Sequence, residues 1–270
     1  MATDLALTSS QLVALQAQWP PPTVVDVRRA PAFERDPRII PGAIRRLPEQ
    51  VTRWSLELEP WRPVVVYCVH GHEVSQDAAS TLSAAGFDAT TLVDGIEEGW
   101  KAEGHAVVPF APPTHWVTRA RPKIDRIACP WLIRRFIDPE AVFHYVAPAD
   151  VRSFAQAHGA IAYDVPDVDY THVGERCSFD AFIARHELCD PALATLAAIV
   201  RAADTGVPEQ APAAGGLLAI SLGLSAMLAD DHVMLRWGLL TYDALYAWCR
   251  GSQGEQHGWH PETLRAAAGH

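Results

Sequence analysis

Hydrophobic and polar positions alternate in two different ways over roughly the first hundred residues. Short apolar, β-branched runs are typical of buried strands, and the stretches between them have apolar residues at helical spacing. Strands and helices in this alternation predict an α/β domain, a parallel sheet with helices on both faces. The predicted strands are 23–27, 64–67 and 89–93, and the predicted helices are 11–18, 48–54, 74–85 and 96–102.

From about residue 117 the pattern changes to long helical periods with few strands, which predicts a mostly helical α+β domain. Pro130 is expected in the first turn of a helix, and Asp190 with Pro191 forms a cap and first turn. The predicted helices are 130–136, 148–157, 178–187, 191–203, 213–228 and 231–250, and the predicted strands are 142–146 and 161–165.

A proline-rich, nearly uncharged segment separates the two patterns and is interpreted as a linker. The predicted organisation is a first domain at 1–108, a linker at 109–116, a second domain at 117–250 and a polar tail at 251–270.

Composition and charge exclude several classes of protein. The 270 residues carry a net charge of −10, which argues against nucleic-acid binding because that needs a basic surface. No secretory signal is visible, and the longest apolar run, 217–229, is too short to span a bilayer. The five cysteines are widely spaced without a C-x-x-C pair, so neither a disulfide framework nor a zinc finger is expected. A reducing cytoplasm fits best, with no membrane partner.

Cys68 stands directly after a predicted buried strand and before a tight loop with Gly71 and a helix. Backbone N–H groups and the positive end of the helix dipole at such a position favour the thiolate form of a cysteine. The sequence therefore predicts an accessible, nucleophilic thiol, and the alternative is an inactive module with a buried free cysteine.

Four stretches in order resemble the rhodanese superfamily: VVDVRR, IPGAI, YCVHGHEVS and LVDGIEEGW. The resemblance covers residues 5–107 and implies a sulfurtransferase that carries sulfur as a persulfide on Cys68, without a cofactor. The backbone N–H groups of residues 69–75 would stabilise the terminal sulfur. The predicted catalytic set is Cys68, His70, Gly71, His72, Glu73, Val74 and Ser75, with Asp26 and Arg28. For Asp26 the alternative is a strand end that accepts loop hydrogen bonds, with Arg28 as a partner.

The side chains of this loop affect which sulfur donor is favoured. Many rhodaneses place Arg or Lys here, whereas this loop has His70, His72 and Glu73. Glu73 disfavours an anionic donor, which the two histidines offset when protonated. A neutral or protein-bound persulfide is thus at least as suitable a donor as thiosulfate, with a thiol as acceptor.

Four long stretches of the second domain resemble the C-terminal domain of the chromate-resistance ChrB family: 119–146, 164–182, 190–204 and 230–249. The resemblance implies a role in chromate resistance or response. Regulators of that family carry a basic DNA-binding region before this domain, where this chain has a rhodanese-like domain instead. A role in transcription is therefore not expected.

Basic residues gather at the start of the second domain in an otherwise acidic chain. Clustered guanidinium groups suit a tetrahedral dianion such as chromate or sulfate. The alternative is a solvated helix face that pairs with Asp125, Asp138 and Glu140. The candidate anion-binding residues are Arg119, Arg121, Lys123, Arg126, Arg134 and Arg135.

Possible metal ligands are scattered along the same domain. Asp204 lies at the C-terminal end of a predicted helix, where a carboxylate opposes the dipole and needs a partner such as Arg201 or a cation. The alternatives are a helix cap at Asp230 or Asp231, and a loop hydrogen bond or packed thiol elsewhere. The candidate ligands are His172, Cys177, Asp204, Asp230, Asp231 and His232, and the remaining cysteines, Cys129, Cys189 and Cys249, are expected in the core.

The leading hypothesis from sequence is a two-domain sulfurtransferase that works through Cys68 in a chromate- or oxidant-resistance setting. The alternative is a chromate- or metal-binding sensor whose rhodanese-like domain serves as a docking or thiol-redox module.

Overall fold

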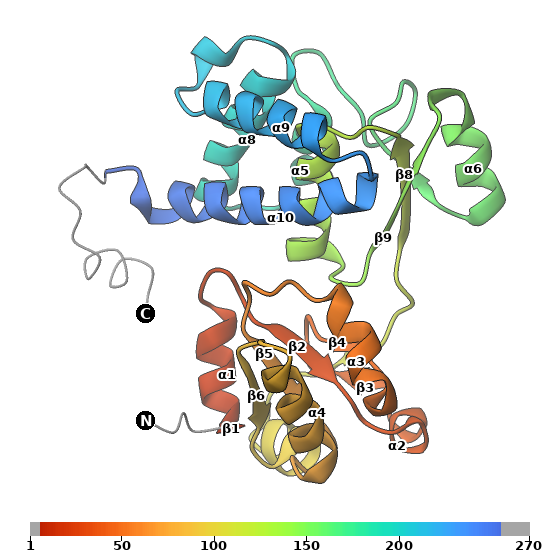
Figure 1. Cartoon of the computed structure of the whole chain (residues 1–270), viewed down its shortest axis with the longest axis vertical. Coiled ribbons are helices and arrows are strands. Elements are labelled where there is room, and N and C mark those ends of the chain that lie inside the picture. The colour runs from red at the N-terminus through yellow and green to blue at the C-terminus, as the bar shows by residue number, and fades with distance from the viewer. Residues whose placement is uncertain (1–5, 255–270) are drawn as a thin grey trace. The chain divides into compact units, whose positions relative to one another are not determined.

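The structure, a computed structural model, describes residues 6–254 (Figure 1). This part of the chain divides into two compact units between Pro112 and Pro113. Residues 255–270, most of the predicted polar tail, lie outside the described range. Within residues 6–254 no helix is both long and apolar enough to cross a membrane.

The first unit is built on a parallel sheet of five strands (Figure 1). β5 lies at its centre, so its carboxyl end opens onto the middle of one sheet edge, where ligand sites of parallel sheets form. The strands in spatial order are β1 (Ala6–Leu7), β6 (Ala89–Leu92), β5 (Val64–Tyr67), β2 (Thr23–Asp26) and β4 (Ile44–Arg45).

Helices cover both faces of this sheet, and the residues of β5 alternate between them. Val64 and Val66 pack under α3 (Val51–Trp54) and α4 (Glu73–Ala84). Val65 and Tyr67 face the other side, with Leu12 of α1 (Ser9–Gln16) and Trp100 of η3 (Gly95–Lys101). All four β5 residues are buried, which is why the strand is continuously apolar. The smaller elements are α2 (Ala30–Arg35), β3 (Arg38–Ile39), η1 (Pro48–Gln50), η2 (Ser55–Glu57) and β7 (Val108–Pro109).

The second unit combines a small parallel sheet with a larger group of helices (Figure 1). Its core includes Trp131, whose ring lies against Phe136, Tyr242 and Tyr246. The sheet order is β10 (Ile161–Ala162), β8 (His115–Arg119), β9 (Val142–Val146). The helical elements are α5 (Asp125–Leu132), η4 (Ile133–Ile137), η5 (Pro148–Asp150), α6 (Val151–His158), α7 (Ser178–Arg185), α8 (Pro191–Asp204), η6 (Pro208–Gln210), α9 (Ala214–Met227), α10 (Asp231–Ala247) and η7 (Trp248–Ser252).

The predicted fold class, an α/β domain followed by a mostly helical α+β domain, is confirmed. Two local predictions are wrong. His115 and Trp116 belong to β8 and not to a linker, because Trp116 is buried among aromatic rings. Pro130 lies inside α5 and not in its first turn, because the N–H groups of Ile127 and Ala128 already close a turn on the carbonyl of Ile124.

Candidate functional site

Cys68 follows β5 directly, and residues 68–72 form a loop that leads into α4. The thiol therefore lies at the carboxyl end of the central strand of the sheet. The loop is anchored from behind: Ile96 donates its N–H to the carbonyl of Cys68 (3.0 Å), and Glu97 donates to that of Val69 (3.1 Å). The start of η3 thus fixes the position of the backbone that carries the sulfur.

Two glycines allow this close contact between the loop and η3. Gly71 has φ +71°, and a Cβ there would lie 2.6 Å from the nitrogen of Asp94. Gly95 has φ +59°, and its Cβ would lie 2.5 Å from the carbonyl oxygen of Val69. Both positions need a left-handed backbone and leave no room for a side chain, so both require glycine.

The carbonyl and N–H groups of the Cys68 loop are used very differently. The carbonyls of residues 68, 69, 71 and 72 accept hydrogen bonds from η3 or from α4. The N–H groups of residues 69–74 donate none within the described chain. His72, the N-terminal cap of α4, offers no side-chain hydrogen bond to them either. A run of uncommitted N–H groups at a helix N-terminus is suited to hold an anion.

The sulfur itself is buried, which corrects the expectation of an accessible thiol. Cys68 is 6 % exposed and belongs to the apolar cluster that includes Val66 and Ala78. The reason is the sequence of α4, whose first buried residue, Ser75, turns its hydroxyl to the thiol at 3.2 Å. That hydroxyl also donates to the carbonyl of His72 (3.0 Å). The N–H of Ser75 is not part of the free set, since it donates to the same carbonyl.

Of the other predicted loop side chains, His70, His72 and Glu73 are exposed. His70 contacts the carboxylate of Glu98 through Nδ1 (2.7 Å), and both side chains are exposed. This contact lowers the pKa of Glu98. Glu73 is exposed in the first turn of α4, and Val74 packs on the same cluster as Cys68. Sequence reasoning missed Glu98, which lies 28 residues along the chain from its partner.

Asp26 and Arg28 form a buried ion pair that supports the first unit. The guanidinium binds both oxygens of the carboxylate, the shortest contact being 2.6 Å, and burial leaves at most 1 % of either side chain exposed. Arg28 also donates to the carbonyls of Asp36 and Arg38. These contacts fix the segment after α2, in agreement with the structural alternative for Asp26.

A second group of chemically active side chains lies in the second unit. Nε2 of His172 is 3.3 Å from Asp125 Oδ2, 3.4 Å from Asp164 Oδ1 and 3.3 Å from Asp204 Oδ2. Asp125 and Asp164 are 2 % and 5 % exposed, whereas His172 is 40 % exposed. Three carboxylates, two of them buried, therefore converge on one imidazole nitrogen that solvent can reach.

Three separate segments supply these four side chains. Asp125 is the first residue of α5, Asp204 is the last of α8, and Asp164 and His172 lie in the loop between β10 and α7. Asp164 has φ +53°, a left-handed conformation that aspartate adopts more readily than most residues. Sequence reasoning found His172 and Asp204 but missed Asp125 and Asp164, because each resembles an ordinary loop or helix-start carboxylate.

The surroundings of the cluster shift its ionisation. Burial first, and then the neighbouring Asp125 carboxylate, raise the pKa of Asp204 to about 7 and raise that of Asp164. Contact with Asp125 raises the pKa of His172 to about 9, although partial burial opposes the shift. Like charges forced together at low exposure disfavour ionised carboxylates and favour a cation among them.

The remaining metal candidates lie elsewhere. Asp230 caps α10 by accepting from His232 N (2.9 Å), as its structural alternative predicted. Asp231 accepts from the N–H of Arg121, and the His232 ring lies against Tyr145. Cys177 is buried at the start of α7, and burial raises the pKa of its thiol.

Of Cys129, Cys189 and Cys249, the three cysteines expected in the core, one does not follow the prediction. All five are unpaired. Cys129 and Cys249 are buried as expected, but Cys189 is exposed because it falls in the turn between α7 and α8 rather than on a helix face.

The basic residues do not form one anion site. Arg119 and Arg126 both contact Asp164, and Arg135 is buried against Asp243. The other two arginines bind carbonyls: Arg121 at Ser225 near the end of α9, and Arg134 at Ala141. Asp164 and Asp243, which sequence reasoning did not single out, therefore take part in these contacts.

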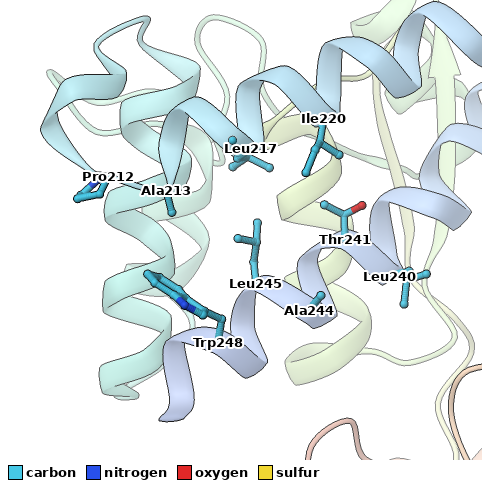
Figure 2. Close-up of a pocket in the computed structure, with 10 residues that line it drawn as sticks. Pro212, Ala213, Leu217, Ile220, Leu240, Thr241, Ala244, Leu245 and Trp248 are labelled. Atoms are coloured by element: carbon cyan, nitrogen blue, oxygen red, sulfur yellow. The ribbon is translucent and has the colours of Figure 1, made fainter. Parts of the chain in front are cut away.

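The second unit also has an apolar pocket of about 560 Å³ between α9 and α10 (Figure 2). Figure 2 shows Leu217 and Ile220 of α9 facing Leu245 of α10, with Trp248 at one end. The Thr241 hydroxyl already donates to the carbonyl of Trp237. A lining of this kind favours hydrocarbon over charged groups, so neither chromate nor sulfate suits this pocket.

Two family models match this chain: the rhodanese-like domain at residues 8–103 and the ChrB C-terminal domain at residues 116–249. The chain is 35% identical over 153 residues to Protein ChrB of Cupriavidus metallidurans, a match that covers 53% of this chain and 46% of that protein. The chain thus spans less than half the length of this curated relative.

Two further proteins resemble the first unit. Thiosulfate sulfurtransferase GlpE of Tolumonas auensis is 28% identical over 93 residues, which cover 34% of this chain and 85% of that protein. A solved structure of a rhodanese-related protein from Thermoplasma volcanium has a TM-score of 0.34 at 27% identity, covering 38% of this chain and 96% of the other.

Proposed function

The chain joins a rhodanese-like domain at residues 8–103 to a ChrB C-terminal domain at residues 116–249, and from this premise we propose that it is a sulfurtransferase that carries sulfur as a persulfide on Cys68, in a chromate-resistance context. The similarity to a thiosulfate sulfurtransferase over the first unit supports the proposal.

One observation carries the proposal: the free N–H groups of residues 69–74 at the N-terminus of α4, next to the only thiol at the carboxyl end of the described sheet. A persulfide is an anion whose charge lies on its outer sulfur. Uncommitted N–H groups stabilise such a charge without any reorganisation of the protein. A cysteine that only packs in the core does not require free N–H groups beside it.

The transfer balances in two steps. The Cys68 thiolate attacks the outer sulfur of a donor persulfide, and the S–S bond of the donor breaks so that its electron pair leaves with the donor thiolate. Cys68 then holds the extra sulfur as a persulfide anion. An acceptor thiolate attacks that outer sulfur, the new acceptor persulfide leaves, and the Cys68 thiolate is restored. In the anionic stages the Ser75 hydroxyl, 3.2 Å from the Cys68 sulfur, can turn its one hydrogen from the carbonyl of His72 and donate a hydrogen bond to that sulfur.

The loop side chains favour a donor with little negative charge. No Arg or Lys lies between residues 69 and 75, Glu73 adds a carboxylate, and His70 is engaged by Glu98. Coulombic repulsion at close range costs a small anion such as thiosulfate more than it costs a persulfide held on a protein or a neutral molecule. We therefore propose a protein-bound or neutral persulfide as donor and a thiol as acceptor.

The ChrB C-terminal domain supplies the context. Chromate is an oxidant of thiols, and a domain that handles transferable thiol sulfur fits a response to it. The family match at residues 116–249 and the similarity to Protein ChrB over 153 residues support this setting.

Mass spectrometry of the intact protein tests the proposal. After incubation with a panel of sulfane donors, the wild type is expected to gain the mass of one sulfur atom and to lose it again to a small thiol. Cys68→Ala should gain none. Cys189→Ser is the matched control, because Cys189 is the exposed cysteine and its loss should leave loading unchanged. Sulfur that loads on Cys189, or no loading of Cys68 by any donor, contradicts the proposal.

A further inference from the structure

We propose that Asp125, Asp164 and His172, whose ligand atoms lie within 4.8 Å of one another, form a binding site for one divalent first-row metal ion, of the class of Mn²⁺ or Zn²⁺, in the ChrB C-terminal domain, and that Asp204, which contacts His172 at 3.3 Å, completes it. This inference goes beyond sulfur transfer and does not depend on Cys68.

The distances indicate ligands around a shared centre. Hydrogen bonds between a charged imidazole and a carboxylate are normally about 2.7–2.9 Å long. The three contacts of the His172 nitrogen are all longer, at 3.3–3.4 Å, and nearly equal. Two ligands that each lie about 2.1 Å from a tetrahedral metal ion are separated by about 3.4 Å. One imidazole N–H also cannot point at three oxygens at once, whereas one metal ion can bind all of them.

The charge balance also calls for a cation. Asp164 is compensated through its other oxygen, which contacts Arg119 Nη2 at 2.6 Å and Arg126 Nε at 3.3 Å. Only 2 % of the Asp125 side chain is exposed, and its carboxylate accepts a hydrogen bond from the backbone N–H of Ser178 at 3.3 Å. Within the described residues, His172 is the cationic side chain that contacts both Asp125 and Asp204. One buried and one partly buried carboxylate that share a single imidazole favour the binding of a divalent ion.

Asp204 supplies an independent argument from its position. It is the last residue of α8, a helix of 14 residues, where the helix dipole is negative. A carboxylate in that position is destabilised unless a positive charge lies beside it. Arg201, the partner expected from sequence, is taken by Asp180 at 2.6 Å. The cation that Asp204 needs must therefore come from the cluster.

The donor set selects the metal class. Three carboxylate oxygens favour Mn²⁺ or Mg²⁺, and an imidazole nitrogen favours Zn²⁺, Fe²⁺ or Cu²⁺. A set that combines them suits Mn²⁺ and Zn²⁺ better than Mg²⁺, which prefers oxygen ligands and several waters. The 40 % exposure of His172 gives an ion a path from solvent.

Calorimetric titration of the chelator-treated full chain with Mn²⁺, Zn²⁺ and Mg²⁺, each alone, tests the inference. One Mn²⁺ or Zn²⁺ per chain is expected. His172→Gln and Asp204→Asn, at the two more exposed ligands, should each weaken binding by more than about tenfold. His232→Gln is the matched control, since His232 lies against Tyr145 and should bind as the wild type does.

Three results would overturn the site. They are no binding of Mn²⁺ or Zn²⁺ by the wild type, binding of Mg²⁺ alone, and binding that His172→Gln and Asp204→Asn leave unchanged although circular dichroism shows both variants folded. Cys68→Ala is expected to bind the metal normally. Failure of the sulfur proposal and failure of the metal site therefore give different results.

Discussion

The Cys68 loop and the His172 cluster, which is Asp125, Asp164, His172 and Asp204, use different chemical groups. The loop is continuous in sequence, and its useful groups are backbone N–H groups held in place by Gly71 and Gly95. The cluster comes from three separate segments, and its useful groups are side chains. The first arrangement suits an anionic sulfur, and the second suits a cation. If both proposals hold, the first unit binds an anion through backbone N–H groups and the second unit binds a cation through side chains. Neither site then needs a basic surface patch.

The largest effect is expected at Gly71, which allows the Cys68 loop to lie against η3. Gly71→Ala forces a Cβ to within 2.6–2.8 Å of three backbone atoms at positive φ, so we expect a loss of at least about 3 kcal/mol of unfolding free energy and loss of sulfur loading. Gly104→Ala, also at positive φ but with open space around its Cβ, should cost about 1 kcal/mol. Urea unfolding measures both, and equal costs would show that packing against η3 does not hold the loop.

A buried serine hydroxyl in the cluster gives the next effect. Ser178 donates to Asp164 Oδ1 at 3.0 Å, and a hydrogen bond to a charged group contributes about 1.5–3 kcal/mol. Ser178→Ala should therefore destabilise the second unit by about 2 kcal/mol and weaken metal binding, with sulfur loading unchanged. Urea unfolding and the metal titration check both effects. A sulfur-loading defect in this variant would show that the two sites are not independent.

Ser75 is the corresponding hydroxyl in the Cys68 loop. Its contact with the thiol is neutral, so Ser75→Ala should cost only about 1 kcal/mol of stability. The rate of persulfide formation should fall by up to about tenfold, because the anionic sulfur loses one donor. Rapid-quench mass spectrometry measures that rate, and an unchanged rate would assign Ser75 to packing alone.

The smallest effect concerns Asp36, which joins the loop after α2 to η3. Hydrogen bonds from Arg38 and then Lys101 lower the pKa of Asp36 below its usual 3.8. A depressed pKa stabilises the fold in full above the unfolded value of 3.8, and this contribution decreases as the pH falls below 3.8 and is lost below the lowered pKa of the folded state. Asp36→Asn should cost less than about 1 kcal/mol at pH 7 and a smaller amount at pH 2. Equal costs at both pH values would contradict the assignment.

The Cys68 loop was largely predictable because its signal is local. A buried strand, a cysteine, a glycine and a helical period stand in a row, and the structure places β5 at 64–67 and α4 at 73–84. Solvent access to the sulfur was not predictable, because Ser75 and the apolar cluster meet Cys68 only in three dimensions.

The His172 cluster was half predictable. Asp204 stood out because a carboxylate at a helix C-terminus is unfavourable. Asp125 gave no such signal, because a carboxylate is expected at a helix N-terminus, where it begins α5. The arginines show the same limit: their spacing indicated a cluster, but the fold pairs Arg119 with Asp164 and Arg135 with Asp243, 45 and 108 residues away.

Native mass spectrometry of one sample tests the account most directly, because it reports both sites in the same molecule. Protein exposed to a persulfide donor and to Mn²⁺ or Zn²⁺ should carry one extra sulfur and one metal ion. Cys68→Ala should lose the sulfur alone, and His172→Gln should lose the metal alone. If either variant lost both, or if the wild type carried neither, the account of two separate sites would be contradicted.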